Sequence, residues 1–128
     1  MPSFKTWDVV RVPFPYTDRP IRQRRPALVI VADGLQNGHG LLWVLMITSA
    51  ENRGWPGDVA ISDLPASGLP VASVVRTAKI ATIEAADAET IGVVSEADRA
   101  PVRRHLATAF TAIEFGPSSS ANTATVIC

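Results

Sequence analysis

Short strand-like segments, separated by turn residues, occupy most of this 128-residue chain and are followed by one amphipathic helix pattern. The expected strands are residues 9–14, 27–32, 41–47, 58–62, 73–83 and 91–94. Five or six short strands at this spacing are typical of a small β-barrel, because several short strands can bury one common core. The sequence therefore predicts a mainly β fold, a barrel closed by a C-terminal α-helix. The chain length fits one domain.

Two segments constrain the strand pattern further. Residues 33–40 contain Asp, Gly and Asn, and Asn37-Gly38 predicts a tight hairpin turn. Residues 41–47 are apolar without interruption, which predicts burial of both faces in the core, or of one face in an interface with a second subunit. This run is far shorter than the roughly 20 residues that span a bilayer, so no membrane association is expected.

The helix pattern lies near the C-terminus. Ser95 and Asp98 are both candidate N-caps, and Asp98 is preferred because it places Pro101 in the first helical turn. The apolar stripe of this helix consists of Val102, Leu106, Phe110 and Ile113. Gly116-Pro117 is expected to end it, and residues 117–128 are expected to form a disordered tail.

Charge and cysteine content limit the function classes. The chain has 12 Lys and Arg and 12 Asp and Glu, so its net charge of zero argues against a protein that coats nucleic acid. The distribution is uneven, since residues 1–83 hold nine basic against six acidic side chains. A local positive patch suits a small substrate with few phosphates. Cys128 is the single cysteine, and the N-terminus has no secretory pattern, so a cytoplasmic location is expected.

The positive excess is concentrated in the loop that precedes the second strand. Its arginines are Arg19, Arg22, Arg24 and Arg25. Pro26 restricts Arg25 to extended backbone at the start of a strand, which directs one guanidinium from a sheet. Forked guanidinium donors match phosphate oxygens. The alternative is a solvated loop in which Arg25 pairs with Asp18 or Asp33.

Several motifs resemble the PemK/MazF toxins, the ribonuclease members of bacterial toxin–antitoxin pairs. Residues 7–18 read Trp-Asp-Val-Val-Arg-Val-Pro-Phe-Pro-Tyr-Thr-Asp, and residues 25–29 read Arg-Pro-Ala-Leu-Val. The family pattern is close to Gly-Asp-Val-Val-x-Val-x-Phe-x-x-Thr-Asp, followed after a loop by Arg-Pro-Ala-Leu-Val. Ile-Thr-Ser at 47–49, Ser-Val-Val-Arg at 73–76 and a short strand at 91–95 follow in the same order.

The resemblance implies an SH3-like, CcdB/PemK-like barrel over residues 1–116 and a homodimer. It also implies a type II toxin that cleaves single-stranded RNA without metal or other cofactor. In that reaction the 2′-hydroxyl attacks the adjacent phosphorus and leaves 2′,3′-cyclic phosphate and 5′-hydroxyl ends. The implied partner is a cognate antitoxin, whose acidic and initially disordered tail would cover the arginine loop.

The same resemblance assigns site residues. It implies catalytic roles for Arg25 and Thr48 and places Ser49 beside them. The structural alternatives are a surface Arg paired with an acid, and a strand-end Thr that hydrogen-bonds to its own backbone. Arg76 matches an arginine that some members use near the scissile phosphate, although an exposed strand arginine is nearly as good a reading. The remaining substrate-binding candidates are Asp18, Arg22, Arg24 and Trp55, the last as a base-stacking surface.

Departures from the family pattern leave alternatives open. Ala78 stands where some members have an Asp proposed as the base, and Trp7 replaces the opening Gly. Asp18, Glu51 and Asp58 are weak candidates for the base. A CcdB-like inhibitor that binds DNA gyrase without cleavage, and a non-toxic β-barrel adaptor, are therefore the rival functions. The two His residues are not paired at a metal-ligand spacing, so no metal site is expected.

Overall fold

The computed structural model describes residues 3–13 and 24–113, which form one six-stranded antiparallel sheet in the order β4-β5-β3-β2-β1-β6. The strands are β1 (Asp8–Pro13), β2 (Arg24–Val31), β3 (Leu41–Ser49), β4 (Asp58–Ala60), β5 (Ser73–Glu84) and β6 (Glu89–Val93). The helices are α1 (Asp33–His39), α2 (Leu64–Ser67) and α3 (Glu96–Thr111), with short 3-10 turns η1 (Ala50–Asn52) and η2 (Ala85–Asp87). The mainly β fold with a C-terminal helix is confirmed, and each expected strand is present with its ends shifted by a few residues.

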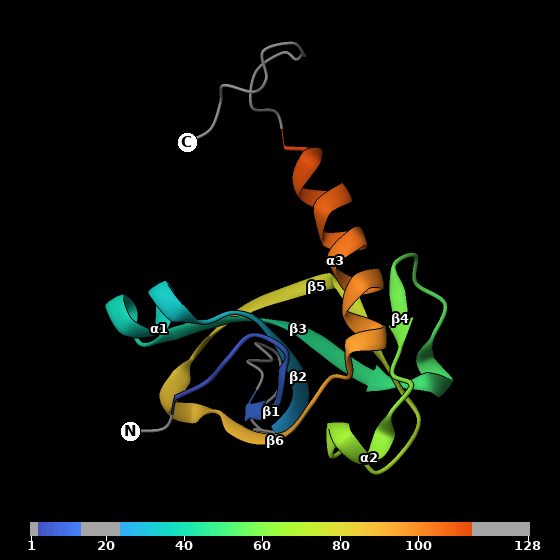
Figure 1. The fold of residues 1–128 in the computed structure, drawn as a ribbon, viewed down its shortest axis with the longest axis horizontal. Coiled ribbons are helices and arrows are strands. Elements are labelled where there is room, and N and C mark those ends of the chain that lie inside the picture. Colours follow the sequence, from blue (N-terminus) through green and yellow to red (C-terminus); the bar gives the residue numbers. More distant parts are fainter. Residues whose placement is uncertain (1–2, 14–23, 114–128) are drawn as a thin grey trace, which may run out of the picture.

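Strong curvature of the sheet comes from an irregular pairing between β3 and β5. Leu45 lies opposite Ile80, whereas the next residue, Met46, lies opposite Arg76, so β5 bulges between these two pairs. The bend lets β5 pair with β4 at one end and continue past β3 toward η2 and β6 at the other (Figure 1). This curvature gives the sheet its barrel-like shape.

The two edge strands, β4 and β6, do not pair with each other, and α2, which follows β4 in the chain, packs against β6. Gly68 ends α2 with a left-handed φ of 75°. A Cβ atom on Gly68 would overlap the Ile91 carbonyl of β6, and one on Gly92 would overlap the Ser67 carbonyl. The two backbones therefore meet directly, through glycines on both sides. No helix in the described part of the chain is long and apolar enough to cross a membrane.

Both faces of the sheet carry a hydrophobic cluster. One includes Val10, Val29, Leu42, Val44 and Met46, and the other includes Val9, Leu28, Leu45, Ile47 and Val102. Alternate residues of β3 thus enter opposite clusters, as expected for a strand buried on both sides.

This packing answers the question that the apolar run 41–47 raised. Both alternating sets are buried within a single chain, and Trp43 is the residue of the run with the largest exposure, at 37%. The run therefore gives no reason for a second subunit, and the homodimer remains a prediction that depends on the resemblance alone.

The predicted hairpin turn at residues 33–40 is wrong, because this segment forms α1. Gly40 adopts a φ of 68° and donates its N–H to Gln36 and Leu35 carbonyls, which ends the helix. The Gln36 side chain also accepts a hydrogen bond from the Phe4 N–H at 2.9 Å and donates to the Phe4 carbonyl at 3.2 Å. These contacts, 32 residues apart in the sequence, stabilise a helix where local turn residues indicated a hairpin.

The expected start of the C-terminal helix is also wrong. Ser95 is the N-cap, and Asp98 lies inside the first turn of α3. The buried carboxylate of Asp98 accepts hydrogen bonds from the Ser62 N–H at 2.8 Å and the Ser62 hydroxyl at 3.0 Å. Asp98 therefore serves a tertiary contact, and Pro101 falls inside the helix rather than in its first turn.

The apolar stripe of α3 is only partly covered. Val102 is fully buried and Leu106 is half-buried, but Phe110 is 41% exposed and Ile113 is 50% exposed. Figure 1 shows the reason, since the C-terminal half of α3 extends away from the sheet. The helix ends at Thr111, and the expected stop at 116–117 and the tail 117–128 lie outside the described residues.

Candidate active site

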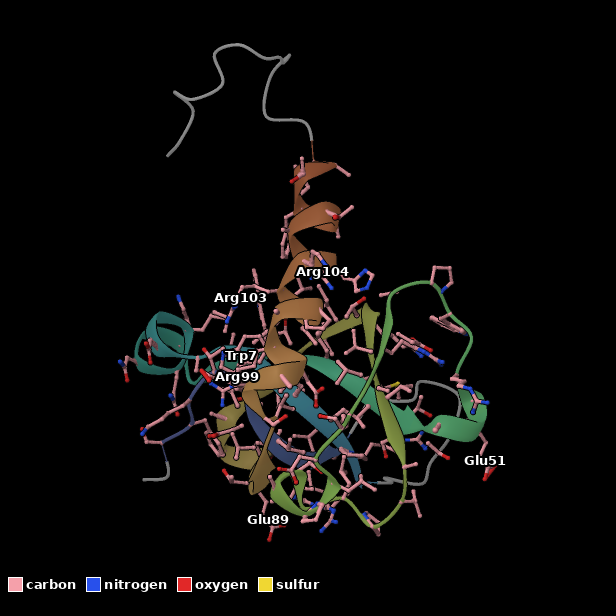
Figure 2. The ribbon with its side chains drawn as sticks, turned by 45° about the vertical axis from the view of Figure 1, so that its right-hand side comes forward. Trp7, Glu51, Glu89, Arg99, Arg103 and Arg104 are labelled. Carbon is pink, nitrogen blue, oxygen red and sulfur yellow. The ribbon has the colours of Figure 1, made fainter. Side chains whose placement is uncertain are left out.

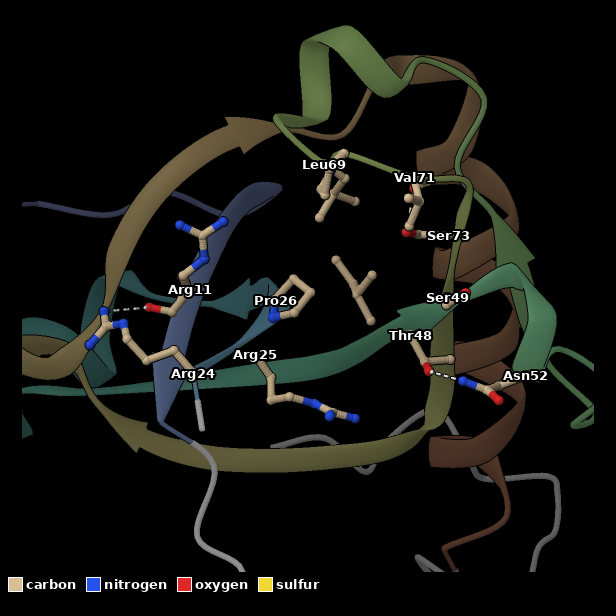
Figure 3. A pocket seen from close by; sticks show the side chains of 12 residues that line it. Arg11, Arg24, Arg25, Pro26, Thr48, Ser49, Asn52, Leu69, Val71 and Ser73 are labelled. Carbon is tan, nitrogen blue, oxygen red and sulfur yellow. Dashed lines mark hydrogen bonds between the residues drawn. The ribbon is translucent and has the colours of Figure 1, made fainter. Parts of the chain in front are cut away.

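A cavity of about 360 Å³ lies where β2 and β3 meet the segment that leads into β5 (Figure 3). Its lining residues are Arg11, Arg24, Arg25, Pro26, Ile47, Thr48, Ser49, Asn52, Leu69, Pro70, Val71 and Ser73. Four of the eight predicted site residues are therefore brought together here: Arg24, Arg25, Thr48 and Ser49. Asp18 and Arg22 lie outside the described residues.

Arg25 is a strand residue, because β2 begins one residue before it. Arg25 lies opposite Val12 of β1, and Pro26 lies opposite Arg11. The guanidinium of Arg25 extends toward Thr48 and Asn52 (Figure 3). The sheet thus directs this cation across the cavity, as the sequence predicted, although the strand starts earlier than expected.

Arg24 points away from Arg25, as adjacent residues of a strand do. Its Nη2 donates to the Arg11 carbonyl at 3.2 Å and to the Asp87 carbonyl at 3.4 Å. It also pairs with Glu89 at 3.8 Å, in an exposed contact. These bonds tie the Arg24 head group to β1, η2 and β6, at the rim of the cavity.

Two hydroxyl groups stand at the end of β3. The Thr48 Oγ1 accepts a hydrogen bond from Asn52 Nδ2 at 3.1 Å, and the Ser49 Oγ accepts one from the Glu51 N–H at 3.3 Å. The Ser49 hydroxyl therefore caps η1, which follows the strand directly. Since a hydroxyl has one donor and two acceptor sites, both side chains still have an O–H to donate.

Arg76 lies behind this strand end and does not line the cavity. Its Nη2 is 2.9 Å from Asp58 Oδ2, and its Nε donates to Asp58 Oδ1 at 3.2 Å. Nη2 also donates to the Asn52 carbonyl at 2.7 Å. The two paired side chains are only 9% and 8% exposed, so this is a buried ion pair. The resemblance places Arg76 near the scissile phosphate, whereas in the structure its guanidinium binds Asp58 and the Asn52 carbonyl and so supports the loop.

The ion pair sets the protonation of both groups. The hydrogen bond from Arg76 lowers the pKa of Asp58, with further help from the Trp55 and Gly54 N–H groups, while burial acts in the opposite direction. The hydrogen bond to Asp58 likewise raises the pKa of Arg76. Asp58 is therefore an ionised, fully engaged carboxylate, which makes it unsuited to act as a general base near neutral pH.

Trp55 lies in the same loop, and its ring is 4.1 Å from the Arg76 guanidinium carbon. The residue is 45% exposed. It does not line the cavity, so a stacking role for Trp55 would need an RNA that extends beyond the cavity. Glu51, on η1, is exposed. Within the described ranges, no three His, Cys, Asp or Glu side chains form a group that could hold a metal ion.

Sequence reasoning missed several lining residues. Asn52 is four residues beyond Thr48, and its signal was Ser49, a residue type that favours a helical turn after the strand. Arg11 lies between the buried Val10 and Val12 of β1, so it faces away from them, and it lines the cavity. The apolar wall of Leu69, Pro70 and Val71 belongs to a loop without any recognisable motif. Together these groups can bind an anion against the Arg25 guanidinium, and the flat apolar face of a ligand against the wall of Leu69, Pro70 and Val71.

Solved structures share this architecture. A MazF from Deinococcus radiodurans is 23% identical and has a TM-score of 0.69, covering 87% of this chain and 99% of that chain. A MazE–MazF complex from the same organism is 23% identical, with a TM-score of 0.67 and coverage of 86% and 97%. An endoribonuclease in complex with its cognate antitoxin, from a mycobacterial species, is 20% identical, with a TM-score of 0.65 and coverage of 87% and 96%. At these identities the likeness establishes the fold.

No curated protein matches the sequence significantly. A match to a family model, however, identifies the family. Residues 5–110 match the PemK-like, MazF-like toxins of type II toxin–antitoxin systems, and this range includes every described strand and nearly all of α3. The cavity, with Arg25 and Thr48 on neighbouring strands, lies within the matched range. The chain therefore belongs to the PemK-like, MazF-like toxin family of type II toxin–antitoxin systems.

Proposed function

We propose that this toxin is an endoribonuclease that cleaves single-stranded RNA without a metal ion. The observation that carries the proposal is the meeting of Arg25 and Thr48, from adjacent strands, at one cavity. RNA supplies its own nucleophile, because the 2′-hydroxyl can attack the adjacent phosphorus. The 2′-hydroxyl loses its proton as it attacks, the bond from phosphorus to the 5′-oxygen breaks, and that oxygen takes up a proton. The products are a 2′,3′-cyclic phosphate and a 5′-hydroxyl.

The protein's main task in this reaction is to stabilise charge on the phosphoryl oxygens. The Arg25 guanidinium offers a rigid fork of donors for two of these oxygens. The Thr48 and Ser49 hydroxyls add neutral donors from the end of β3. Such fixed donors act where charge develops in the transition state and are often the largest single contribution to catalysis. We assign no general base, because Asp58 is held by Arg76 and Glu51 is exposed and does not line the cavity. Asp18 lies outside the described residues.

The other parts of the assignment have separate support. A relative described as an endoribonuclease bound to its cognate antitoxin supports an antitoxin partner for this chain. We propose that an acidic tail of that partner approaches the arginine loop, and that the toxin acts as a homodimer. The family match and the MazF structures do not favour the gyrase-binding alternative.

The test is cleavage of a long single-stranded RNA by the purified wild-type protein in excess EDTA. We expect cleavage to persist and the products to carry 2′,3′-cyclic phosphate ends. Arg25→Ala should reduce the rate by about 10²–10³-fold, because one charge-stabilising donor is lost. Arg25→Lys should restore little of it, since an ammonium group lacks the fork. Loss of cleavage on chelation, 5′-phosphate products or full activity of Arg25→Ala would contradict the proposal.

A further inference from the structure

Asn52 joins the cavity to the buried ion pair behind it. Its side-chain amide donates to Thr48 Oγ1 at 3.1 Å, and its backbone carbonyl accepts from Arg76 Nη2 at 2.7 Å. Figure 3 shows the amide beside Thr48, and both residues line the cavity. One residue thus contacts a predicted catalytic hydroxyl with its side chain and the scaffold with its main chain.

This arrangement determines what the Thr48 hydroxyl can do. A threonine hydroxyl has one hydrogen to donate and two lone pairs that accept. Because Asn52 donates into one lone pair, it leaves the hydroxyl hydrogen free for another acceptor. On the open side of the cavity that acceptor would be a phosphoryl oxygen of bound RNA. We propose that Asn52 is a positioning residue, which holds the Thr48 hydroxyl as a donor toward the scissile phosphate. This inference rests on the proposed ribonuclease function.

The loop between η1 and β4 is built to hold Asn52 still. Asp58 Oδ2 accepts hydrogen bonds from the Gly54 and Trp55 N–H groups, both at 3.2 Å, while it binds Arg76. Arg76 in turn stacks against the Trp55 ring and binds the Asn52 carbonyl. The main chain at residue 52 is therefore anchored from β5, whereas its side chain is exposed.

That exposure separates a positioning role from a structural one. Within the described residues, the Asn52 amide bonds to no side chain except that of Thr48. Removing an exposed amide should leave the melting temperature unchanged. Its loss should reduce the rate only through the orientation of Thr48, so the effect should fall on kcat rather than on KM.

The experiment compares Asn52→Ala, Asn52→Asp, Thr48→Ala and the double variant Asn52→Ala/Thr48→Ala, with Asn37→Ala on α1 as the matched control. Asn37 is also exposed and lies away from the cavity lining. We expect Asn52→Ala to lower kcat by about three- to tenfold, the usual effect of one lost hydrogen bond. In the Thr48→Ala background the same change should have no further effect, because its target is gone.

Asn52→Asp should be worse than Asn52→Ala at neutral pH. An ionised carboxylate can only accept, so it would turn the Thr48 hydrogen away from the substrate. The deficit in kcat of Asn52→Asp relative to the wild type should diminish as the pH falls toward about 4, where the carboxyl group regains a proton. The kcat of the wild type should show no such rise on acidification.

The outcomes separate the two proposals. Cleavage by the wild type and Asn37→Ala, with a non-additive loss at Asn52 and Thr48, supports the positioning role. Additive losses, or a wild-type rate for Asn52→Ala, overturn this inference and leave the ribonuclease function intact. A wild-type protein that cleaves no RNA overturns the function and the inference together.

Discussion

Two tryptophan–arginine clusters stabilise this molecule in different ways. In the first, which we call the Trp55 cluster, Arg76 stacks on Trp55 at 4.1 Å and pairs with Asp58. In the second, the Trp7 cluster, the guanidinium carbons of Arg99 and Arg103 lie 5.6 and 5.3 Å from the centre of the Trp7 ring (Figure 2). The same residue types thus produce one neutral assembly and one with two positive charges.

Burial explains the difference in charge. Both charged side chains of the Trp55 cluster are less than 10% exposed, and a buried cation without a counter-ion would be strongly destabilising. Arg103 is exposed, so water solvates it. Within residues 3–13 and 24–113, neither Arg99 nor Arg103 forms an ion pair with a carboxylate. Arg99 also donates its Nε hydrogen to the Val94 carbonyl at 3.1 Å. The Trp7 ring and this one neutral hydrogen bond therefore hold the two arginines without a counter-ion.

The backbones of the two tryptophans also differ. Trp7 has a φ of 83°, the left-handed conformation that glycine adopts most easily. Its N–H donates to the Val29 carbonyl at 2.8 Å, and its carbonyl accepts from the Val94 N–H at 3.0 Å, so both polar groups of its main chain are bonded, to β2 and to the residue after β6. This position is where the resembled family pattern has Gly. The Trp7 side chain packs against the arginines of α3, a contact that glycine could not make.

The comparison teaches that the two clusters hold different parts of the molecule. The Trp55 cluster anchors the loop that carries Asn52 at the cavity, through hydrogen bonds to its main chain. The Trp7 cluster attaches α3 to the start of β1, mainly through one ring. Changes in the first should therefore affect both stability and the site, and changes in the second should affect stability alone.

The largest expected effect comes from neutralising Asp58. Asp58→Asn keeps the shape but leaves Arg76 as a buried cation without its counter-ion, so we expect a loss of about 3 kcal/mol in the free energy of unfolding. Urea denaturation followed by circular dichroism measures this loss. Adding Arg76→Met should restore part of it, because the unpaired charge is then removed. If the double variant is less stable than either single variant, the charge is not the cause.

A smaller effect should follow from removing the other ring. Trp7→Ala loses the contacts with α3 and keeps the strained backbone, so we expect a loss of about 2 kcal/mol. Trp7→Gly loses the same contacts but relieves the strain, and should be more stable than Trp7→Ala by about 1 kcal/mol. Thermal and urea unfolding of both variants give the comparison. Equal stability of the two would mean that the left-handed backbone carries no penalty.

The smallest effect is a pH dependence confined to the Trp55 cluster. Because Arg76 lowers the pKa of Asp58, the ion pair contributes its full stability above the ordinary aspartate value near 3.9, and the contribution declines as the pH falls below that value toward the folded-state pKa. The difference in unfolding free energy between wild type and Asp58→Asn should therefore be constant from pH 7 to about pH 5 and shrink below about pH 4.

The Trp7 cluster supplies the control for this titration. Within the described residues, neither of its arginines pairs with a carboxylate. The difference between wild type and Trp7→Ala should therefore stay constant over the same interval of pH. A difference for Asp58→Asn that grows on acidification would refute the link.

Much of the site could be predicted from the sequence because it depends on local pattern. Arg25 directly precedes Pro26, Thr48 and Ser49 end an apolar strand, and the family match confirms the toxin family that these motifs indicated. Alternation within each strand is a property of two or three neighbouring residues. The strands, their order along the chain and the final helix were therefore predictable without any contact between distant segments.

What the tertiary structure decided are the contacts between residues far apart in the chain. Asp58 pairs with Arg76 across 18 residues, Gln36 binds Phe4 across 32, and Asp98 binds Ser62 across 36. In each pair, the local sequence alone permits another role. Arg76 could contact a phosphate, residues 33–40 could form a hairpin, and Asp98 could cap the helix. The fold selects one role in each case, because a buried donor or charge must find its partner where the sheet and helices place it.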